Sequence, residues 1–259
     1  MNIVVLAKQV PDAEALIEIG AGGEKLDIEQ KFAANLFDEF AIEEALRIKE
    51  KHGGRVKVIT MGVGKATEVL RTAIAMGADE AFLVDADASR HDGYSTALIL
   101  SNAISKDPPD VILCGKQAVD SDRGEVGQMV AQFLGLPHVG NVVRLDIADG
   151  KAVAESITEA GREVVEVSLP AVFAAQKGLN EPRVPQITGV MKAMKAQIPR
   201  LALEELGLID EGAGRADAKI KIKRYISPKK RPAVQLIAGE PMEAAADAVR
   251  ILVDVERVI

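Results

Sequence analysis

Hydrophobic and polar positions follow one rhythm in the first half of the chain. Continuous apolar runs, typical of strands buried on both faces of a sheet, occur at 2–7, 55–61, 80–84 and 111–114. Apolar residues at helical spacing follow these runs at 35–50, 65–76, 94–104 and 125–134. This alternation predicts an α/β fold with a doubly wound, mostly parallel sheet.

The rhythm changes after Gly135. Short alternating runs, typical of antiparallel strands, follow at 142–147, 152–157 and 164–169. Turn signals such as Asp149-Gly150 separate them, so we expect an antiparallel meander that extends the sheet. A further apolar strand is expected at 170–175. Segment 8–35 carries a glycine cluster and is predicted to be a long loop with a small hairpin.

The last third of the chain is less regular. Segment 177–195 contains Pro182 and Pro185, so we predict a stiff irregular protrusion rather than a helix. Beyond it, the patterns predict a short helix and a linker at 199–217, an edge strand at 220–225 and an amphipathic helix at 241–258. We expect an α/β domain at 1–200, and a linker with a C-terminal arm at 201–259.

Composition limits the classes of function. The 259 residues carry a net charge of -7 and no Trp, which disfavours a nucleic-acid partner. Cys114 is the single cysteine, and no window approaches the roughly 18 apolar residues of a membrane span, so we expect a cytoplasmic protein without membrane insertion. The three histidines are scattered, and no nucleophile-elbow or Walker pattern is present. We therefore expect no catalytic residue and no metal site.

Segment 111–134 joins a buried strand, a polar turn and a helix. In an open α/β sheet such a junction lies where small ligands bind, and unpaired amides of the first helical turn can bind a phosphate. Gly115, Gly124 and Gly127 are then expected to let the backbone approach the ligand. An ordinary connection between a strand and a helix is the alternative.

The polar residues of the two helix starts have expected roles. Asn35 or Asp38 is expected to cap the helix at 35–50. In the turn after residue 114, Asp122 is expected to cap the following helix and Asp120 to contact ribose or base. Arg123 is either a planar ligand for phosphate or a solvated loop charge.

Three stretches carry a family resemblance. They read NLFDEFAIEEA at 35–45, GKQAVDSDRGEVGQM at 115–129, and the series L-P-A-V, L-N-E-P-R and M-K-A that begins at Leu169, Leu179 and Met191. They resemble the beta subunits of electron transfer flavoproteins, and the resemblance covers nearly the whole chain. It implies a fold like that of the adenine-nucleotide alpha-hydrolases and a heterodimer whose alpha subunit holds most of the FAD.

In that family, this chain would supply one wall of the flavin site and hold a structural AMP. The complex would carry electrons from dehydrogenases, of the acyl-CoA type, to a membrane quinone oxidoreductase or another acceptor. Phe37 would face the flavin; without the resemblance, a core-facing residue is the simpler reading. The implied cofactor contacts are Leu6, Asn35, Leu36, Phe37, Asp38, Met61, Gly115, Lys116, Gln117, Ala118, Val119, Asp120, Arg123, Gly124, Glu125 and Val126.

The resemblance also implies contacts with protein partners. Loop 175–197 would dock into a groove on the dehydrogenase with Ile187 as its anchor, whereas the alternative is a loop folded back on its own core. Lys192 and Lys195 would either steer acidic partners or remain a solvated rim. The C-terminal arm would cross onto the alpha subunit or lie on this chain's own surface. The implied docking residues are Leu179, Asn180, Glu181, Pro182, Arg183, Ile187, Met191 and Lys192.

Departures from the family pattern leave the subtype open. AMP-binding members commonly read N-Q-T-G at the positions of residues 124–127, and electron-bifurcating members, which hold a second FAD in place of AMP, tend to read T-A-Q-V-G-P. Val126 matches the bifurcating type, whereas Gln128 and Met129 match the AMP type. A bifurcating subunit with NADH as donor is therefore the second reading. A stand-alone nucleotide-binding regulator or hydrolase is a third, which the docking-loop match disfavours.

Overall fold

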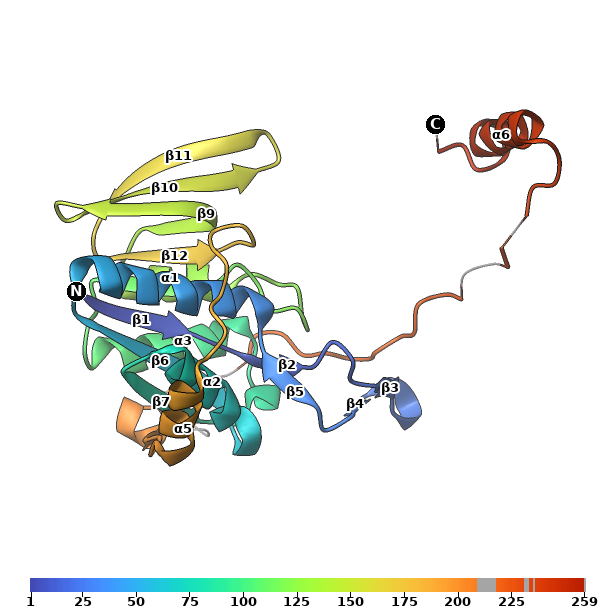
Figure 1. Ribbon diagram of the computed structural model, residues 1–259. Helices are drawn as coiled ribbons and strands as arrows, with labels where there is room; N and C mark the ends of the chain where they lie inside the picture. Colours follow the sequence, from blue (N-terminus) through green and yellow to red (C-terminus); the bar gives the residue numbers. More distant parts are fainter. Residues whose placement is uncertain (209–217, 231–232, 235, 259) are drawn as a thin grey trace. The chain divides into compact units, whose positions relative to one another are not determined.

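The computed structural model describes residues 1–208, 218–230, 233–234 and 236–258 (Figure 1). The chain divides into two compact units, Met1–Arg224 and Tyr225–Ile259. The first unit contains a nine-stranded sheet with the order β11-β10-β9-β12-β8-β1-β6-β7-β13. It includes residues beyond 200, because Arg200–Leu201 forms the edge strand of this sheet.

The centre of the sheet is parallel, as the continuous apolar runs predict. Its strands are β1 (Asn2–Leu6), β6 (Arg55–Gly62), β7 (Glu80–Asp85), β8 (Val111–Gly115), β12 (Ala171–Ala175) and β13 (Arg200–Leu201). The chain runs outward from β1 through β6 and β7, and then returns to pair β8 with the other side of β1. The direction of winding therefore reverses between β1 and β8, and the carboxyl ends of these two strands bound the crevice where such sheets bind ligands.

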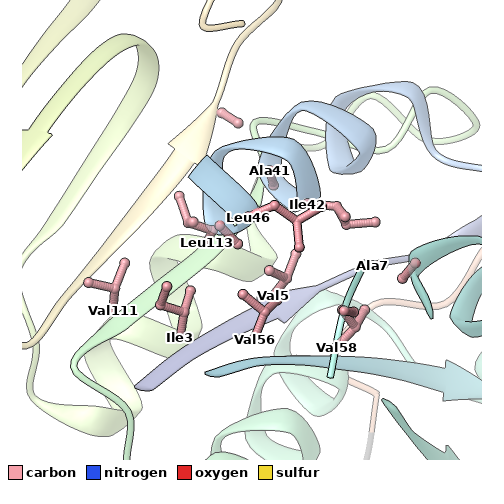
Figure 2. Close-up of a cluster of buried hydrophobic side chains, with 14 of the residues drawn as sticks. Ile3, Val5, Ala7, Ala41, Ile42, Leu46, Val56, Val58, Val111 and Leu113 are labelled. Carbon is pink, nitrogen blue, oxygen red and sulfur yellow. The ribbon is translucent and has the colours of Figure 1, made fainter. Parts of the chain in front are cut away.

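Helices cover both faces of the sheet, which confirms the doubly wound fold. One hydrophobic cluster joins the sheet to α1 (Leu36–His52), α2 (Thr67–Met76) and α5 (Ile187–Lys195), and a second joins it to α3 (Gly93–Ser105) and α4 (Val126–Leu134). Figure 2 shows the first cluster, where Val5 of β1 and Leu113 of β8 lie beneath Ile42 of α1. Short 3-10 turns, η2 (Gly64–Ala66) and η3 (Ala88–Arg90), precede α2 and α3.

The antiparallel meander is also confirmed. Strands β9 (His138–Ala148), β10 (Lys151–Thr158) and β11 (Gly161–Ser168) pair in sequence, and β9 joins the parallel part through β12. Asp149 and Gly150 form the first tight turn, with φ angles of 51° and 74°. The long loop after β1 holds the pairs β2 (Gln9–Pro11) with β5 (Phe32–Ala34) and β3 (Ile17–Ile19) with β4 (Leu26–Ile28), joined in the second case by η1 (Ala21–Gly23).

Two local predictions were wrong. The segment 177–195 is irregular only as far as Gln186 and then forms α5, because both prolines precede the helix and leave its hydrogen bonds intact. Residues 220–225 form no strand: the amides of Lys219 and Ile220 donate to the Asp92 carboxylate at 2.6 and 2.8 Å instead of to a neighbouring strand.

The remaining C-terminal predictions had mixed outcomes. The short helix after residue 199 is one 3-10 turn, η4 (Glu204–Leu206), and the predicted linker at 209–217 lies outside the described residues. The last helix is confirmed as α6 (Pro241–Arg250), which continues into a π-helical turn, η5 (Ile251–Val255). None of the described residues in α6 is buried.

Candidate nucleotide site at the carboxyl edge of the sheet

Asp38, in the first turn of α1, joins the two strands at the point where the winding reverses. One oxygen, Oδ2, accepts the Lys8 amide at 2.7 Å, and Oδ1 accepts the Gly115 amide at 2.9 Å. Lys8 lies just after β1 and Gly115 ends β8, so one carboxylate fixes both loops. Burial raises the pKa of Asp38 to about 7, even though both amide bonds favour the ionised form.

Asn35 holds the next part of the same turn. Its Nδ2 donates to the carbonyl of Gln117 at 2.9 Å, and its Oδ1 accepts the amide of Val119 at 3.1 Å. The expected cap is therefore wrong: neither Asn35 nor Asp38 caps α1 with its side chain, because both side chains bond to the backbone of another loop. The beginning of α1 instead fixes residues 115–119, which begin the second of the three stretches that carry the family resemblance.

The charged residues of the turn also pair within the chain. Lys8 Nζ contacts both oxygens of Asp120 at 2.7 Å, which links the loop after β1 to the turn after β8. Asp122 does not cap α4: its Oδ1 accepts the Gln117 side chain at 2.7 Å, and its φ angle is +53°. Arg123 lies 3.5 Å from Glu125. Lys8 was not predicted as a site residue, although its position directly after the first strand was a usable signal.

The beginning of α4 has the properties of an anion site. No side chain caps it, and the amides of its first turn have no partner four residues back within the helix. Gly124 takes a left-handed φ of +61° just before it, which turns the chain into the helix. Lys116 Nζ lies 5.0 Å from the centre of the Phe37 ring on the same edge of the sheet. Backbone donors at the start of a helix suit the phosphate of a nucleotide.

Two of the glycines have a packing role that the sequence did not predict. A Cβ atom on Gly115 would lie 2.6 Å from Phe37 Cβ, and one on Gly127 would lie 2.6 Å from Cys114 Sγ. These glycines therefore allow α1 and α4 to pack closely on β8. Cys114 itself is buried, and burial raises the pKa of its thiol to about 12.

The other predicted cofactor residues lie at the same edge. Leu6 ends β1 and is buried, and Met61 lies next to the last residue of β6. Leu36 and Val119 are 46% and 45% exposed, so they present apolar surface beside the turn. Ala118 accepts the Asp122 amide at 2.8 Å and closes that turn. All the predicted cofactor residues thus lie at the ends of β1, β6 and β8, in the turn after β8, or at the start of α1 and α4.

The predicted docking residues divide into two groups. Asn180 is buried, and its Nδ2 donates to the Phe40 carbonyl at 3.0 Å and to Glu44 at 2.9 Å. Arg183 pairs with Glu43 at 2.8 Å and with Glu50. Leu179 packs against the core, whereas Glu181 is exposed and Pro182 is partly buried. The first half of the segment is therefore folded onto α1.

The second group lies on α5 and faces outward. Ile187, Met191 and Met194 are 80%, 54% and 74% exposed and recur at helical spacing. Lys192 and Lys195 are exposed beside this apolar stripe. An apolar stripe with a basic border is a surface that suits a protein partner.

Other classes of site were searched across the described part of the chain. It holds no group of three or more metal-ligating side chains. Within the same residues, no helix combines the length and apolarity needed to cross a bilayer. Burial lowers the pKa of His138, whose Nε2 lacks a hydrogen-bond partner.

Comparison with known proteins agrees with this geometry. Residues 26–206 match the family described as the electron transfer flavoprotein domain. The chain is 38% identical to the electron transfer flavoprotein subunit beta of Bacillus subtilis, over 100% of both chains, and 38% identical to that of Thermoanaerobacterium thermosaccharolyticum, over 97% and 98%. It is also 36% identical to the caffeyl-CoA reductase-Etf complex subunit CarD of Acetobacterium woodii, over 95% of both. The chain therefore belongs to the electron transfer flavoprotein family, as one of its beta subunits, which are electron-carrier subunits that pair with an alpha subunit.

Proposed function

We propose that this chain, with its alpha subunit, carries electrons from acyl-CoA-type dehydrogenases to a membrane quinone oxidoreductase or another acceptor. The FAD, held mainly by the alpha subunit, supplies the redox chemistry when it is bound. This chain forms one wall of its site with Phe37 and the neighbouring turn. The full-length similarity to beta subunits supports the proposal.

The same chain holds a structural AMP at the carboxyl edge of the sheet. The uncapped first turn of α4 carries this assignment, because its amides are donors for a phosphate. Asn35 and Asp38 do not contact the ligand themselves; they hold the turn at residues 115–119 by hydrogen bonds to its backbone. The Lys8–Asp120 pair closes the edge where the two loops meet.

A bifurcating complex, with a second FAD in place of AMP and NADH as donor, is the second candidate. Val126 favours it in the sequence, and the name of one relative, from a caffeyl-CoA reductase-Etf complex, describes a carrier joined to a reductase. Co-expression with the alpha subunit, acid release of the bound nucleotides and chromatography separate the two. One FAD and one AMP per heterodimer support the simple carrier, whereas two FADs without AMP support the bifurcating complex. A chain that is loaded with nucleotide and active without an alpha subunit would contradict both.

The dehydrogenase docks on the apolar stripe of α5, with Ile187 as the anchor. Burying this side chain on a partner is worth roughly 1.5–3 kcal/mol, enough for a hot spot in a transient complex. Ile187→Ala is expected to weaken electron transfer from the dehydrogenase and to leave the FAD content unchanged. Loss of flavin, or unchanged transfer, would contradict the anchor assignment.

The C-terminal arm is proposed to contact the alpha subunit. Met242 and Val249 in α6 are 88% and 53% exposed, and Val255 in η5 is 69% exposed. This apolar surface suits a subunit interface. Truncation after Arg224, the last residue of the first unit, is expected to weaken assembly with the alpha subunit in size-exclusion chromatography.

A further inference from the structure

Arg71 of α2 caps the carboxyl end of α5. Its Nη1 donates to the carbonyl of Ala193 and, at 3.4 Å each, to those of Met194 and Ala196. The last carbonyls of a helix have no partner within the helix, and a positive charge there also opposes the negative end of its dipole. No side chain caps the amino end of this nine-residue helix. Arg71 therefore provides the side-chain cap of α5, at its carboxyl end. A helix of this length is marginal without tertiary contacts.

Gly189 lies where α5 packs against α2. A Cβ atom there would collide with the Ala75 carbonyl oxygen of α2, so glycine allows α5 to lie directly against α2. Ala193, one helical turn further, is buried in the core. Gly189 and Ala193 share one face of α5, and Ile187 and Met191 lie on the other. The contacts with α2 therefore set the rotation of α5 that turns the apolar stripe outward.

We propose that Arg71 is a positioning residue for docking: it holds α5 preformed, so that the partner meets a rigid apolar stripe. The inference rests on the docking function proposed above. A surface that is already ordered loses less conformational entropy on binding, which raises affinity without a new contact. The planar guanidinium can serve several carbonyls at once, whereas a lysine ammonium is a single point charge.

The test uses the heterodimer loaded with FAD, and an acyl-CoA dehydrogenase reduced by its acyl-CoA substrate. Arg71→Met is expected to raise the KM for the flavoprotein about tenfold, with kcat within twofold, because docking and not the flavin is changed. The KM of Arg71→Lys is expected to lie between those of the unmodified protein and Arg71→Met. The matched control is Arg162→Met, which removes an exposed arginine whose ion pair with Glu155 lies on the meander. FAD content is measured in every variant.

Hydrogen exchange provides a readout that does not depend on the partner. In Arg71→Met, amides 191–196 are expected to exchange faster, while those of β1 and β8 keep their rates. Faster exchange throughout the sheet, or loss of FAD, would show a general structural role and overturn the inference.

A double-mutant cycle with Ile187→Ala links Arg71 to the stripe. If Arg71 acts by presenting Ile187, the double variant raises KM by less than the product of the two single effects. An effect of Ile187→Ala without any effect of Arg71→Met on KM would overturn the inference and leave the docking function standing. If neither variant changes KM, the docking function fails as well.

Discussion

Two regions contact α1: the proposed nucleotide site at the carboxyl edge of the sheet (the nucleotide edge) and the proposed docking loop 175–197 (the docking segment). They use their side chains in opposite ways. At the nucleotide edge, the polar side chains of Asn35 and Asp38 point inward and are only 1% and 5% exposed. At the docking segment, the apolar side chain of Ile187 points outward and is 80% exposed. The polar residues of the nucleotide edge thus hydrogen-bond the protein's own backbone, whereas the apolar residue of the docking segment is exposed on the surface.

This difference separates the residues that build a site from those that touch its ligand. At the nucleotide edge, Asn35 and Asp38 hold the backbone of residues 115–119, and the proposed ligand groups are main-chain amides at the start of α4, which no side chain caps. In the docking segment, Asn180 and Arg183 build the base on α1, and the stripe on α5 is left for contact. The following predictions test this division of roles.

The largest expected effect is the pH dependence of Asp38. Its pKa is about 7 in the folded protein and 3.8 ordinarily, so between these values the folded state keeps a proton that the unfolded state has released. The contribution of Asp38 to stability is therefore complete below pH 3.8 and is lost as the pH rises to about 7. Relative to Asp38→Asn, the unfolding free energy of the unmodified protein should fall by about 2–4 kcal/mol across this range.

Urea unfolding of both proteins at a series of pH values measures this difference. The neighbouring Cys114 thiol does not titrate in this window, because its pKa is about 12. The opposite result would be an unfolding free energy of the unmodified protein that rises relative to Asp38→Asn as the pH rises. It would mean that the hydrogen bonds from the Lys8 and Gly115 amides stabilise the ionised carboxylate more than burial destabilises it. In that case the inward-facing carboxylate is an ionised clamp in the whole range.

Gly115→Ala tests the close packing of α1 on β8. The new methyl group would lie 2.6 Å from Phe37 Cβ, so α1 must move away from the strand and weaken the Asp38 clamp. We expect a loss of about 1–3 kcal/mol of stability and a lower AMP content in the purified heterodimer. The control is Gly140→Ala, because its methyl group would meet His138 at an ordinary 3.5 Å. Equal effects of both substitutions would contradict the packing role of Gly115.

Asn180→Ala tests whether the base of the docking segment belongs to the fold. The change leaves the Phe40 carbonyl and Glu44 without their buried donor, which should cost about 1–2 kcal/mol in urea unfolding. Lys192→Ala, at an exposed position of α5, is the control and should change stability by less than about 0.5 kcal/mol. Unchanged stability of Asn180→Ala combined with lost electron transfer would instead make Asn180 a contact for the partner.

Much of the fold could be predicted from the sequence, because the signals are local. Continuous apolar runs specify strands buried on both faces, and Asp149-Gly150 specifies a tight turn. The helix α5 was missed because Pro182 and Pro185 dominated the pattern, although both precede it. The carbonyls at its end are bonded by Arg71, more than a hundred residues earlier in the chain, and no local pattern reveals such a contact.

The candidate site shows the same limit. Asn35 or Asp38 was predicted to cap α1 and Asp122 to cap α4, and none of the three does. Each side chain had a local capping role available, and each bonds to another group instead: Asn35 and Asp38 to backbone on other loops, Asp122 to the side chain of Gln117. Capping preferences describe an isolated helix, whereas the partners of Asn35 and Asp38 come into reach only after β1 and β8 are paired.

The smallest expected effect is that of Lys8→Met. Lys8 and Asp120 are 42% and 27% exposed, and exposed ion pairs contribute about 0–1 kcal/mol because water and salt screen them. Thermal unfolding should therefore change little, and the small difference should shrink further in 0.5 M salt, where the screening length is about half of its physiological value. AMP content should fall, because the substitution removes a positive charge at this edge and leaves the Asp120 carboxylate without its Lys8 partner. A stability loss above about 2 kcal/mol would show that the Lys8–Asp120 pair, like Asp38, holds the loop after β1 against the turn after β8. The structural part of the nucleotide edge would then include these partly exposed side chains.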